Sequence, residues 1–194
     1  EVYQEMSGML IFVGIFISGM FTLSYGQFMS GWEASHFDRL LSTNISTYNY
    51  YMSKLWLFWF ISTIMFVLSL PYFYFGQRIV FLNFMAYLFN LGISPLIIFV
   101  FSLYNYKKID LAGSAAFNWQ GVSGKNFVLM IPILLIPILL YLLFKLFGVP
   151  EYGIYAIGTL GVLGVALTKF WLNQIVKVFQ KKKYAIAAGF RENE

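Results

Sequence analysis

The chain has 194 residues, of which 60% are hydrophobic, 21% aromatic and only 11% charged, and its formal net charge is +5. A soluble domain carries about 25% charged residues, and a soluble chain of this length cannot hide so much apolar surface in one core. Cysteine is absent and there is one histidine, which excludes disulfides and thiolate chemistry and argues against a metal site. The composition therefore predicts an all-α, polytopic transmembrane helical bundle.

Five stretches of the sequence are long and apolar enough to be membrane spans. Crossing about 30 Å of hydrocarbon takes roughly 20 mainly apolar residues in a helix, and backbone polar groups in lipid must be satisfied within that helix. We expect a single transmembrane domain over residues 1–194, taken from a longer protein because the initiator methionine is missing. The predicted spans are residues 7–29, 55–76, 79–104, 126–148 and 152–172, with larger loops at 30–54 and 105–125 and a tail at 173–194.

Small residues recur at helical spacing in the first and in the last predicted span. Such stripes let helices approach each other closely in lipid, where no hydrophobic force drives association. We interpret them as packing within one subunit, and a subunit interface or a sliding contact is the alternative. The residues concerned are Gly14, Ser18, Thr22, Gly26, Gly158, Gly161 and Gly164.

The polar segment between the first two spans, HFDRLLSTNISTYNYYMSK, has the periodicity of a helix. Its apolar residues fall on one face, which predicts a short amphipathic helix ending near Asn44 that lies along the membrane surface or against a partner. Ser46 or Thr47 can then cap a new helix that leads through Lys54 into the second span. The predicted apolar face consists of Phe37, Leu40, Leu41 and Ile45.

The third predicted span contains the strongest candidates for a transport path. Asn90, Gly92, Ser94 and Pro95 favour a broken or re-entrant helix, because proline removes a backbone hydrogen bond. Broken helices often line transport paths in membrane proteins. Asn83 and Asn90 lie seven residues apart and would face a cavity together with Pro95, or else bond to a neighbouring helix.

The sequence lacks the residues that are characteristic of several kinds of function. No Asp or Glu lies deep in a predicted span, which argues against a proton-coupled or sodium-coupled carrier. The sequence has no phosphate-binding loop, no metalloprotease motif and no catalytic pair. We therefore expect no enzyme activity, no metal and no cofactor in this chain. The lysine-rich tail is interpreted as an anchor near anionic lipid, and we expect no nucleic-acid partner.

The basic residues predict the orientation in the membrane. Of the 13 Lys and Arg residues, all except Arg78 and Lys145 fall on the side of the two larger loops and the tail. Because positive charge is retained in the cytoplasm, we expect the N-terminus outside and both loops and the tail in the cytoplasm.

The segment LLSTNISTYNYYMSK, residues 40–54, resembles the loop between the second and third helices of ABC-2-type exporter permeases. Asn44 and Ser53 depart from that pattern, which has proline and glycine at these places. The residues that match it are Leu40, Leu41, Ile45, Ser46, Tyr50 and Lys54.

Four further stretches, PYFYFG, NLGISP, AAFNWQG and KKKYAIAAGFRE, extend the resemblance to the C-terminal half of a poorly characterised bacterial family of ABC-2-like permeases. The resemblance implies a permease component of an ABC-type exporter in the bacterial inner membrane, with ATP and Mg held by a separate ATPase subunit. It implies a coupling helix over residues 32–46 and completion by further permease helices or a second copy. The residues implied to contact the ATPase are Phe37, Asp38, Arg39, Leu40, Leu41 and Ile45.

The sequence does not identify the transported cargo. An apolar interior with few charges is compatible with a lipid and with a peptide-like cargo. A non-transporting membrane scaffold or assembly subunit is the alternative function, and an intramembrane enzyme is disfavoured by the missing catalytic groups.

Overall fold

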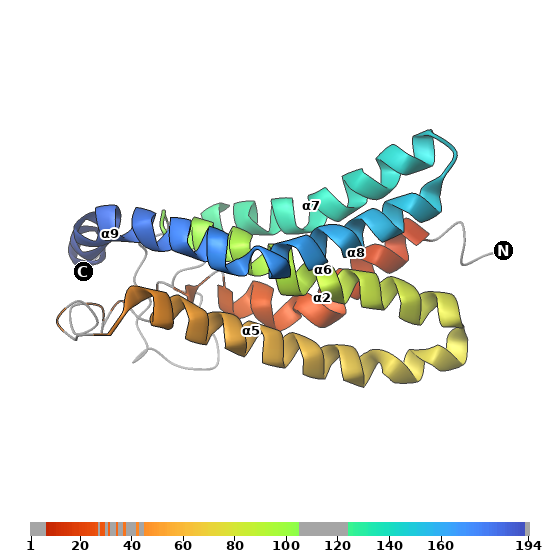
Figure 1. The fold of residues 1–194 in the computed structure, drawn as a ribbon, viewed down its shortest axis with the longest axis horizontal. Coiled ribbons are helices and arrows are strands. Elements are labelled where there is room, and N and C mark those ends of the chain that lie inside the picture. The colour runs from red at the N-terminus through yellow and green to blue at the C-terminus, as the bar shows by residue number, and fades with distance from the viewer. Residues whose placement is uncertain are drawn as a thin grey trace.

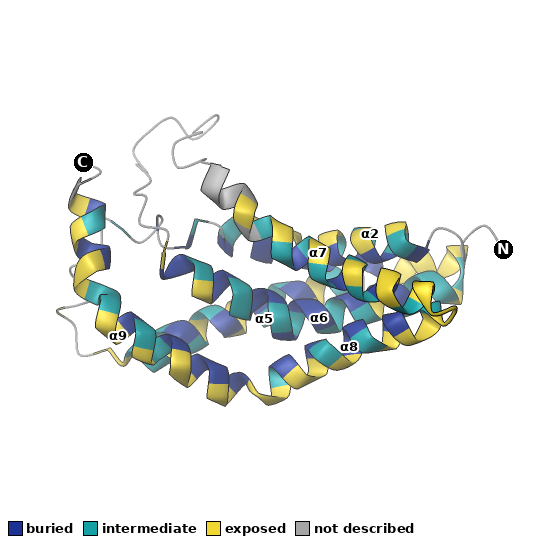
Figure 2. Ribbon diagram, turned by 90° about the horizontal axis from the view of Figure 1, so that it is seen from above, coloured by how far each residue is buried: buried dark blue, intermediate teal, exposed yellow. Residues whose placement is uncertain are grey.

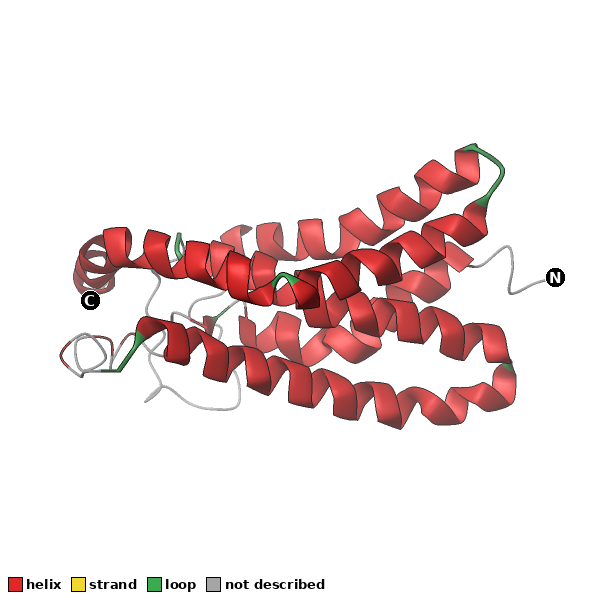
Figure 3. Ribbon diagram, in the orientation of Figure 1, coloured by secondary structure: helices red, strands yellow, loops and turns green. Residues whose placement is uncertain are grey.

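The computed structural model describes residues 7–26, 28, 29, 31, 34, 37, 42, 45–104 and 124–192, and in this part it contains helices and no strand (Figure 3). This confirms the predicted all-α class. The elements are α2 (Ser7–Gly26), α5 (Thr47–Ser69), the 3-10 helix η2 (Leu70–Phe75), α6 (Gln77–Ser102), α7 (Gly124–Leu146), α8 (Pro150–Ala166) and α9 (Thr168–Glu192).

The helices α2, α5, α6, α7 and α8 run along the long axis of the molecule in alternating directions (Figure 1). The start of α2, the link from η2 to α6 and the link from α7 to α8 lie at one end, which we call the Gly76 end. The start of α5, the end of α6 and the start of α7 lie at the other end together with α9, and we call this the α9 end. The helix α6 makes its most extensive contacts with α8 and α2, so it forms the centre of the bundle.

Three helical segments, Ser7–Gly26, Thr47–Phe75 and Gln77–Ser102, are long and apolar enough to cross a membrane. The helices α8 and α9 meet this criterion only together, and they bend by 64° at their junction, which would make a fourth span. In α7 the apolar part is shorter, Met130–Leu146. The described residues therefore provide three helices suited to a membrane, or four if the bent pair is one span.

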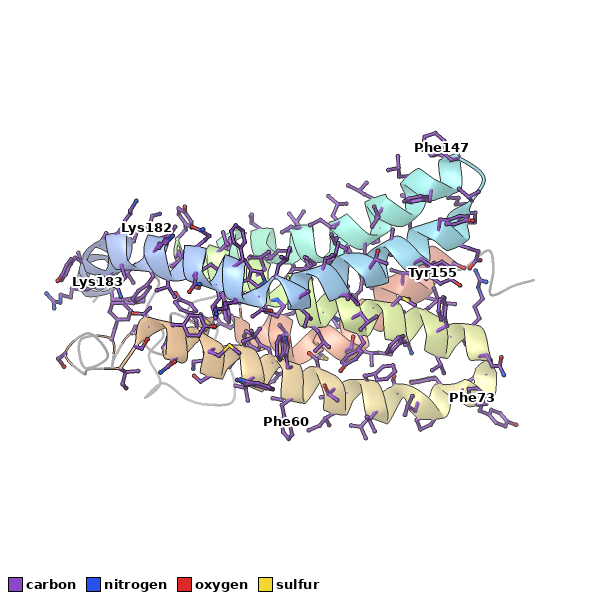
Figure 4. The ribbon with its side chains drawn as sticks, in the orientation of Figure 1. Phe60, Phe73, Phe147, Tyr155, Lys182 and Lys183 are labelled. Atoms are coloured by element: carbon purple, nitrogen blue, oxygen red, sulfur yellow. The ribbon has the colours of Figure 1, made fainter. Side chains whose placement is uncertain are left out.

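The outer surface of the bundle is rich in large apolar side chains. Buried residues gather between the helices and exposed ones lie on their outward faces (Figure 2). Phe60, Phe73 and Phe147 point away from the bundle (Figure 4) and are 65%, 57% and 75% exposed. An apolar surface of this extent is unfavourable in water and is the usual surface of a protein in lipid.

The helix α5 begins at Thr47, with Ser46 at the N-cap position in an extended conformation, as the sequence predicted. The Ser46 side chain makes no capping hydrogen bond, so the capping interaction itself is not present. The end of this span is 3-10 helix, with Pro71 in its first turn, where proline needs no N–H partner. Gly76, at φ +139°, then allows the tight reversal into α6.

The prediction that the third span is broken is wrong, because α6 continues through Pro95 to Ser102. Proline lacks the N–H that would bond to the carbonyl of Leu91, four residues earlier. The indole Nε1 of Trp59, on α5, donates to that Leu91 oxygen at 2.7 Å. A neighbouring helix thus supplies the missing donor, and α6 stays intact.

The break occurs instead in the last predicted span, at Leu167. The Gly164 carbonyl accepts hydrogen bonds from the Thr168 hydroxyl at 3.3 Å and from the Trp171 indole at 2.8 Å. A threonine that bonds back to the carbonyl four residues earlier tends to bend a helix. The bend lies inside the predicted span of residues 152–172, and the helix after it continues through the predicted tail as far as Glu192.

Candidate functional site

A buried polar group joins α2 to α6 in the middle of the bundle. The Asn90 amide nitrogen donates to the Ile15 carbonyl at 2.9 Å and to the Ser18 hydroxyl at 2.8 Å. The Ser94 hydroxyl donates to the Asn90 amide oxygen at 2.7 Å. Asn90 is 1% exposed, so its amide serves helix packing and corresponds to the alternative that the sequence left open.

The small residues of α2 lie at its contact with α6, as the predicted stripe of small residues in the first span indicates. A Cβ at Gly14 would come within 3.0 Å of the Ala86 Cβ, and one at Gly19 would meet the Asn90 amide. The Thr22 hydroxyl lies 3.4 Å from the Ser62 hydroxyl of α5. All four predicted residues of this stripe, Gly14, Ser18, Thr22 and Gly26, are buried within the chain.

The glycines of α8 press directly against the backbone of α6. A Cβ at Gly161 would overlap the Leu88 carbonyl group, and one at Gly164 would lie 2.7 Å from the Gly92 carbonyl carbon. A Cβ at Gly158 would meet side-chain atoms alone, the flexible Met85 chain and, at 3.6 Å, Leu88 Cδ1. Gly161 and Gly164 therefore set how closely α6 and α8 approach each other.

A cavity of about 300 Å³ lies beside this packed core, toward the Gly76 end. Asn83, predicted for a transport path, is one of its lining residues and is 5% exposed. Asn90 and Pro95 do not line this cavity, so the structure separates the three residues that the sequence grouped together. The cavity is lined by Leu10, Val13, Ile17, Tyr72, Phe75, Ile79 and Asn83.

Aromatic side chains fill the α9 end of the bundle. We call this set the aromatic junction, and it comprises Phe37, Tyr51, Phe58, Phe99, Trp171, Phe179 and Phe190. The Tyr51 ring of α5 lies 5.1 Å from the Phe99 ring of α6 and 5.8 Å from the Phe179 ring of α9. Edge-to-face pairs at such distances are favourable beyond the area they bury, so the junction ties α5, α6 and α9 together.

Phe37 connects the predicted coupling segment to this junction. Its ring lies 6.1 Å from the Phe179 ring and 5.3 Å from the Phe190 ring, and it is 8% exposed. The direct ATPase contact predicted for Phe37 does not fit this burial, because the side chain is already covered by α9. Ile45 is 58% exposed. The other predicted contact residues, Asp38, Arg39, Leu40 and Leu41, lie outside the described residues.

Two polar contacts fasten the start of α5 at the same end. The Lys54 amine donates to the Tyr25 hydroxyl of α2 at 2.7 Å and also lies over the Tyr25 ring. The Gln180 amide of α9 donates to the Thr47 hydroxyl at 2.7 Å. The start of α5 is thereby held by both α2 and α9.

The chain was compared with known proteins and families. A family model described as a family of unknown function, DUF5687, matches residues 1–193. The chain belongs to the DUF5687 family. No curated protein and no solved structure matches it.

The description of DUF5687 assigns no chemistry, so the function of this DUF5687 chain has to be argued from its own residues. Within the described part of the chain, no group of three or more His, Cys, Asp or Glu residues could hold a metal ion. Sequence reasoning missed Trp59, Phe179 and Phe190, because each acts on a partner in a distant segment, and it missed Trp171, whose indole bonds to Gly164 across the helix junction. For Trp171, the glycines Gly158, Gly161 and Gly164 shortly before it were the one local signal available.

Proposed function

We propose that this DUF5687 chain is the membrane-embedded permease component of an ABC-type exporter, driven by a separate cytoplasmic ATPase. The observation that carries the proposal is the burial of Phe37 in the aromatic junction. A coupling segment has to be attached firmly to the helices that it moves. Here the attachment runs from Phe37 to Phe179 in α9, then to Tyr51 in α5 and Phe99 in α6.

The energetics of the junction suit the transmission of force. Replacing a well-packed Phe by Ala typically costs about 3–5 kcal/mol, so a push on residues 30–46 would meet a stiff contact at Phe37. A cavity of about 20 Å³, lined in part by Phe37, Tyr51 and Phe179, lies within the junction. That space is about the size of one water molecule, and it leaves little slack between the segment and the helices.

The proposed orientation in the membrane has five crossings. The helices α2, α5 with η2, α6, α7 and the bent pair α8–α9 alternate in direction (Figure 1), which supports one crossing each. Basic residues concentrate at the α9 end, where Lys182 and Lys183 lie (Figure 4). The positive-inside rule then puts the α9 end in the cytoplasm of a bacterial cell and the Gly76 end outside.

The proposed division of labour in the coupling segment follows from the burial of Phe37. Phe37 anchors the segment to α9, and the contact with the ATPase falls to Asp38, Arg39, Leu40, Leu41 and Ile45. The ATPase holds ATP and Mg, and further permease helices or a second copy complete the pathway. Packing of the glycine stripes within the chain leaves the outer faces of the helices for those contacts.

Affinity purification of the whole protein from its native membranes tests the proposal, with mass spectrometry used to identify a subunit that has an ATP-binding loop. Leu41→Asp puts a charge into the proposed contact and should release that subunit. Tyr74→Asp adds the same charge at the Gly76 end, on a side chain that is 89% exposed, and should retain it.

A second variant separates binding from coupling. Phe37→Ala should keep the ATPase bound but abolish the stimulation of its ATP hydrolysis by the permease, because the contact remains and its anchor is lost. Gel filtration would verify that this variant is still folded. If no ATPase is recovered, or if Leu41→Asp keeps it bound, the exporter proposal fails and the scaffold alternative replaces it.

A further inference from the structure

The cavity near the Gly76 end has an almost entirely apolar lining formed by three elements. Leu10, Val13 and Ile17 of α2 form one wall, Tyr72 and Phe75 of η2 form another, and α6 completes it with Ile79 and Asn83. Its volume, about 300 Å³, lies at the lower end of the range found for ligand pockets.

Asn83 is the exception in this lining. Its side chain is 95% buried, and it makes no hydrogen bond with any other residue that the structure describes. A Cβ at Gly14 would lie 2.8 Å from the Asn83 amide oxygen, so the oxygen faces Gly14 and the amide N–H groups are left for another acceptor. In the described part of the chain, only Arg78 Nε is a fully enclosed side-chain polar atom without a partner, so the Asn83 amide opens on the cavity. A polar group that faces an apolar space without a partner is costly, and more so in lipid, where water cannot supply one.

These two properties define what the cavity would accept. An apolar cavity stays dry, because water needs two to four polar partners. A hydrocarbon chain fits the Leu, Val, Ile and aromatic walls, and one hydrogen-bond acceptor on that chain would satisfy the Asn83 amide. Tyr72, which is 47% exposed, lies at the open side of the cavity and can contact the more polar part of such a molecule.

We propose that this cavity binds the acyl chain of a lipid-like amphiphile and that the Asn83 amide donates a hydrogen bond to its ester or carboxyl oxygen. Gly14 contributes by leaving room for the Asn83 side chain. The inference goes beyond the exporter proposal, since it concerns what the chain binds and holds whether or not an ATPase moves it. Its test accordingly uses no ATPase.

The experiment uses the whole protein in phosphatidylcholine nanodiscs and two photoactivatable probes of equal chain length. One probe is a diazirine-bearing monoacylglycerol, which has an ester carbonyl, and the other is a diazirine-bearing alkane, which has none. Mass spectrometry would locate the labelled residues. We expect both probes to label the cavity residues above the level at lipid-exposed Phe16.

Three variants assign this labelling to the cavity. Val13→Trp fills the space and should remove the cavity label of both probes, whereas Phe16→Trp, on the exposed face of the same helix, should leave it unchanged. Ile17→Phe fills less and serves if Val13→Trp does not fold. Asn83→Leu removes one hydrogen bond, worth about 0.5–1.5 kcal/mol. The ester probe should therefore need an about two- to twelvefold higher concentration for half-maximal labelling, with the alkane probe unaffected.

Three outcomes would overturn the inference. Even labelling over all exposed faces means that only ordinary surrounding lipid is detected. Absence of label at the cavity residues with both probes, while Phe16 is labelled, means that another part of the protein or a second copy fills the space. An equal loss of both probes in Asn83→Leu means that Asn83 only supports the helix packing.

Discussion

Two helix carbonyls in the described part of the chain, those of Leu91 and Gly164, are each bonded by a tryptophan indole, and the helices around them behave differently. At Pro95 the Leu91 carbonyl is bonded by the indole of Trp59, and α6 remains one helix. At Leu167 the Gly164 carbonyl is bonded by the indole of Trp171, and the chain bends by 64°. The same kind of donor thus accompanies a continuous helix in one place and a bend in the other.

The origin of the donor explains the difference. Trp59 comes from α5, a neighbouring helix, and the backbone of α6 is also pressed against the α8 glycines beside Gly92. Trp171 belongs to α9 itself and reaches back across the junction, where Thr168 bonds to the same carbonyl. The donor from α5 accompanies a continuous helix, whereas the donors from the following turn accompany the bend. The helix α7 likewise continues through Pro132 and Pro137. Proline alone therefore does not determine where a membrane helix breaks.

Of the variants that test this difference, Trp171→Ala should lower the stability of the protein most. The side chain is 7% exposed and its ring also contacts Phe99, so we expect a loss of about 3–5 kcal/mol. Thermal unfolding of the purified protein measures this loss. Phe170→Ala, at a site on the same helix that is 65% exposed, should change stability by less than about 0.5 kcal/mol. Equal effects of the two variants would contradict a structural role for the Trp171 indole.

Gly161→Ala tests the close contact between α8 and the backbone of α6. The new Cβ would overlap the Leu88 carbonyl group, so the two helices must separate, at a cost of about 1–3 kcal/mol. Gly158→Ala is the matched control, because its Cβ would meet the flexible Met85 side chain and Leu88 Cδ1 and no backbone atom. The unfolding temperature of Gly158→Ala should be clearly higher than that of Gly161→Ala. The reverse order would exclude the close α6–α8 contact.

Trp59→Phe keeps the ring and removes the donor to the Leu91 carbonyl. Leaving that carbonyl without a partner should cost about 1–2 kcal/mol. Pro95→Ala restores a backbone N–H for the same carbonyl, so Trp59→Phe should cost less in that background. A double-mutant cycle on unfolding measures the coupling. Additive effects would mean that Trp59 does not compensate for Pro95.

Thr168→Val removes one buried hydrogen bond and should give the smallest change in stability, about 0.5–1.5 kcal/mol, but a visible change in shape. Without the hydroxyl bond to Gly164 the bend should become smaller than 64°. The chain has no native cysteine, so spin labels can be introduced in pairs on α8 and α9 to measure the distance between the helices. Thr159→Val is the control, since Thr159 bonds within α8, away from the junction.

Local patterns in the sequence predicted the features that depend on one helix or on helical spacing. The stripes around Gly14 and Gly161, the start of α5 after Ser46 and the apolar helices themselves are of this kind. The continuity of α6 at Pro95 was not predictable, because it depends on a donor in another helix. Periodicity put Phe37 on an exposed face, since nothing near it in the sequence indicates the α9 residues that cover it.

The burial of Phe37 under α9 also sets an order of assembly. The chain is made from the N-terminal side and its parts fold as they become available. The Phe37 ring finds its partners Phe179 and Phe190 only after α8 has been inserted and α9 has been synthesised. Until then the Phe37 ring lacks the α9 side chains that cover it, so we expect its burial to be among the last contacts of the bundle to form.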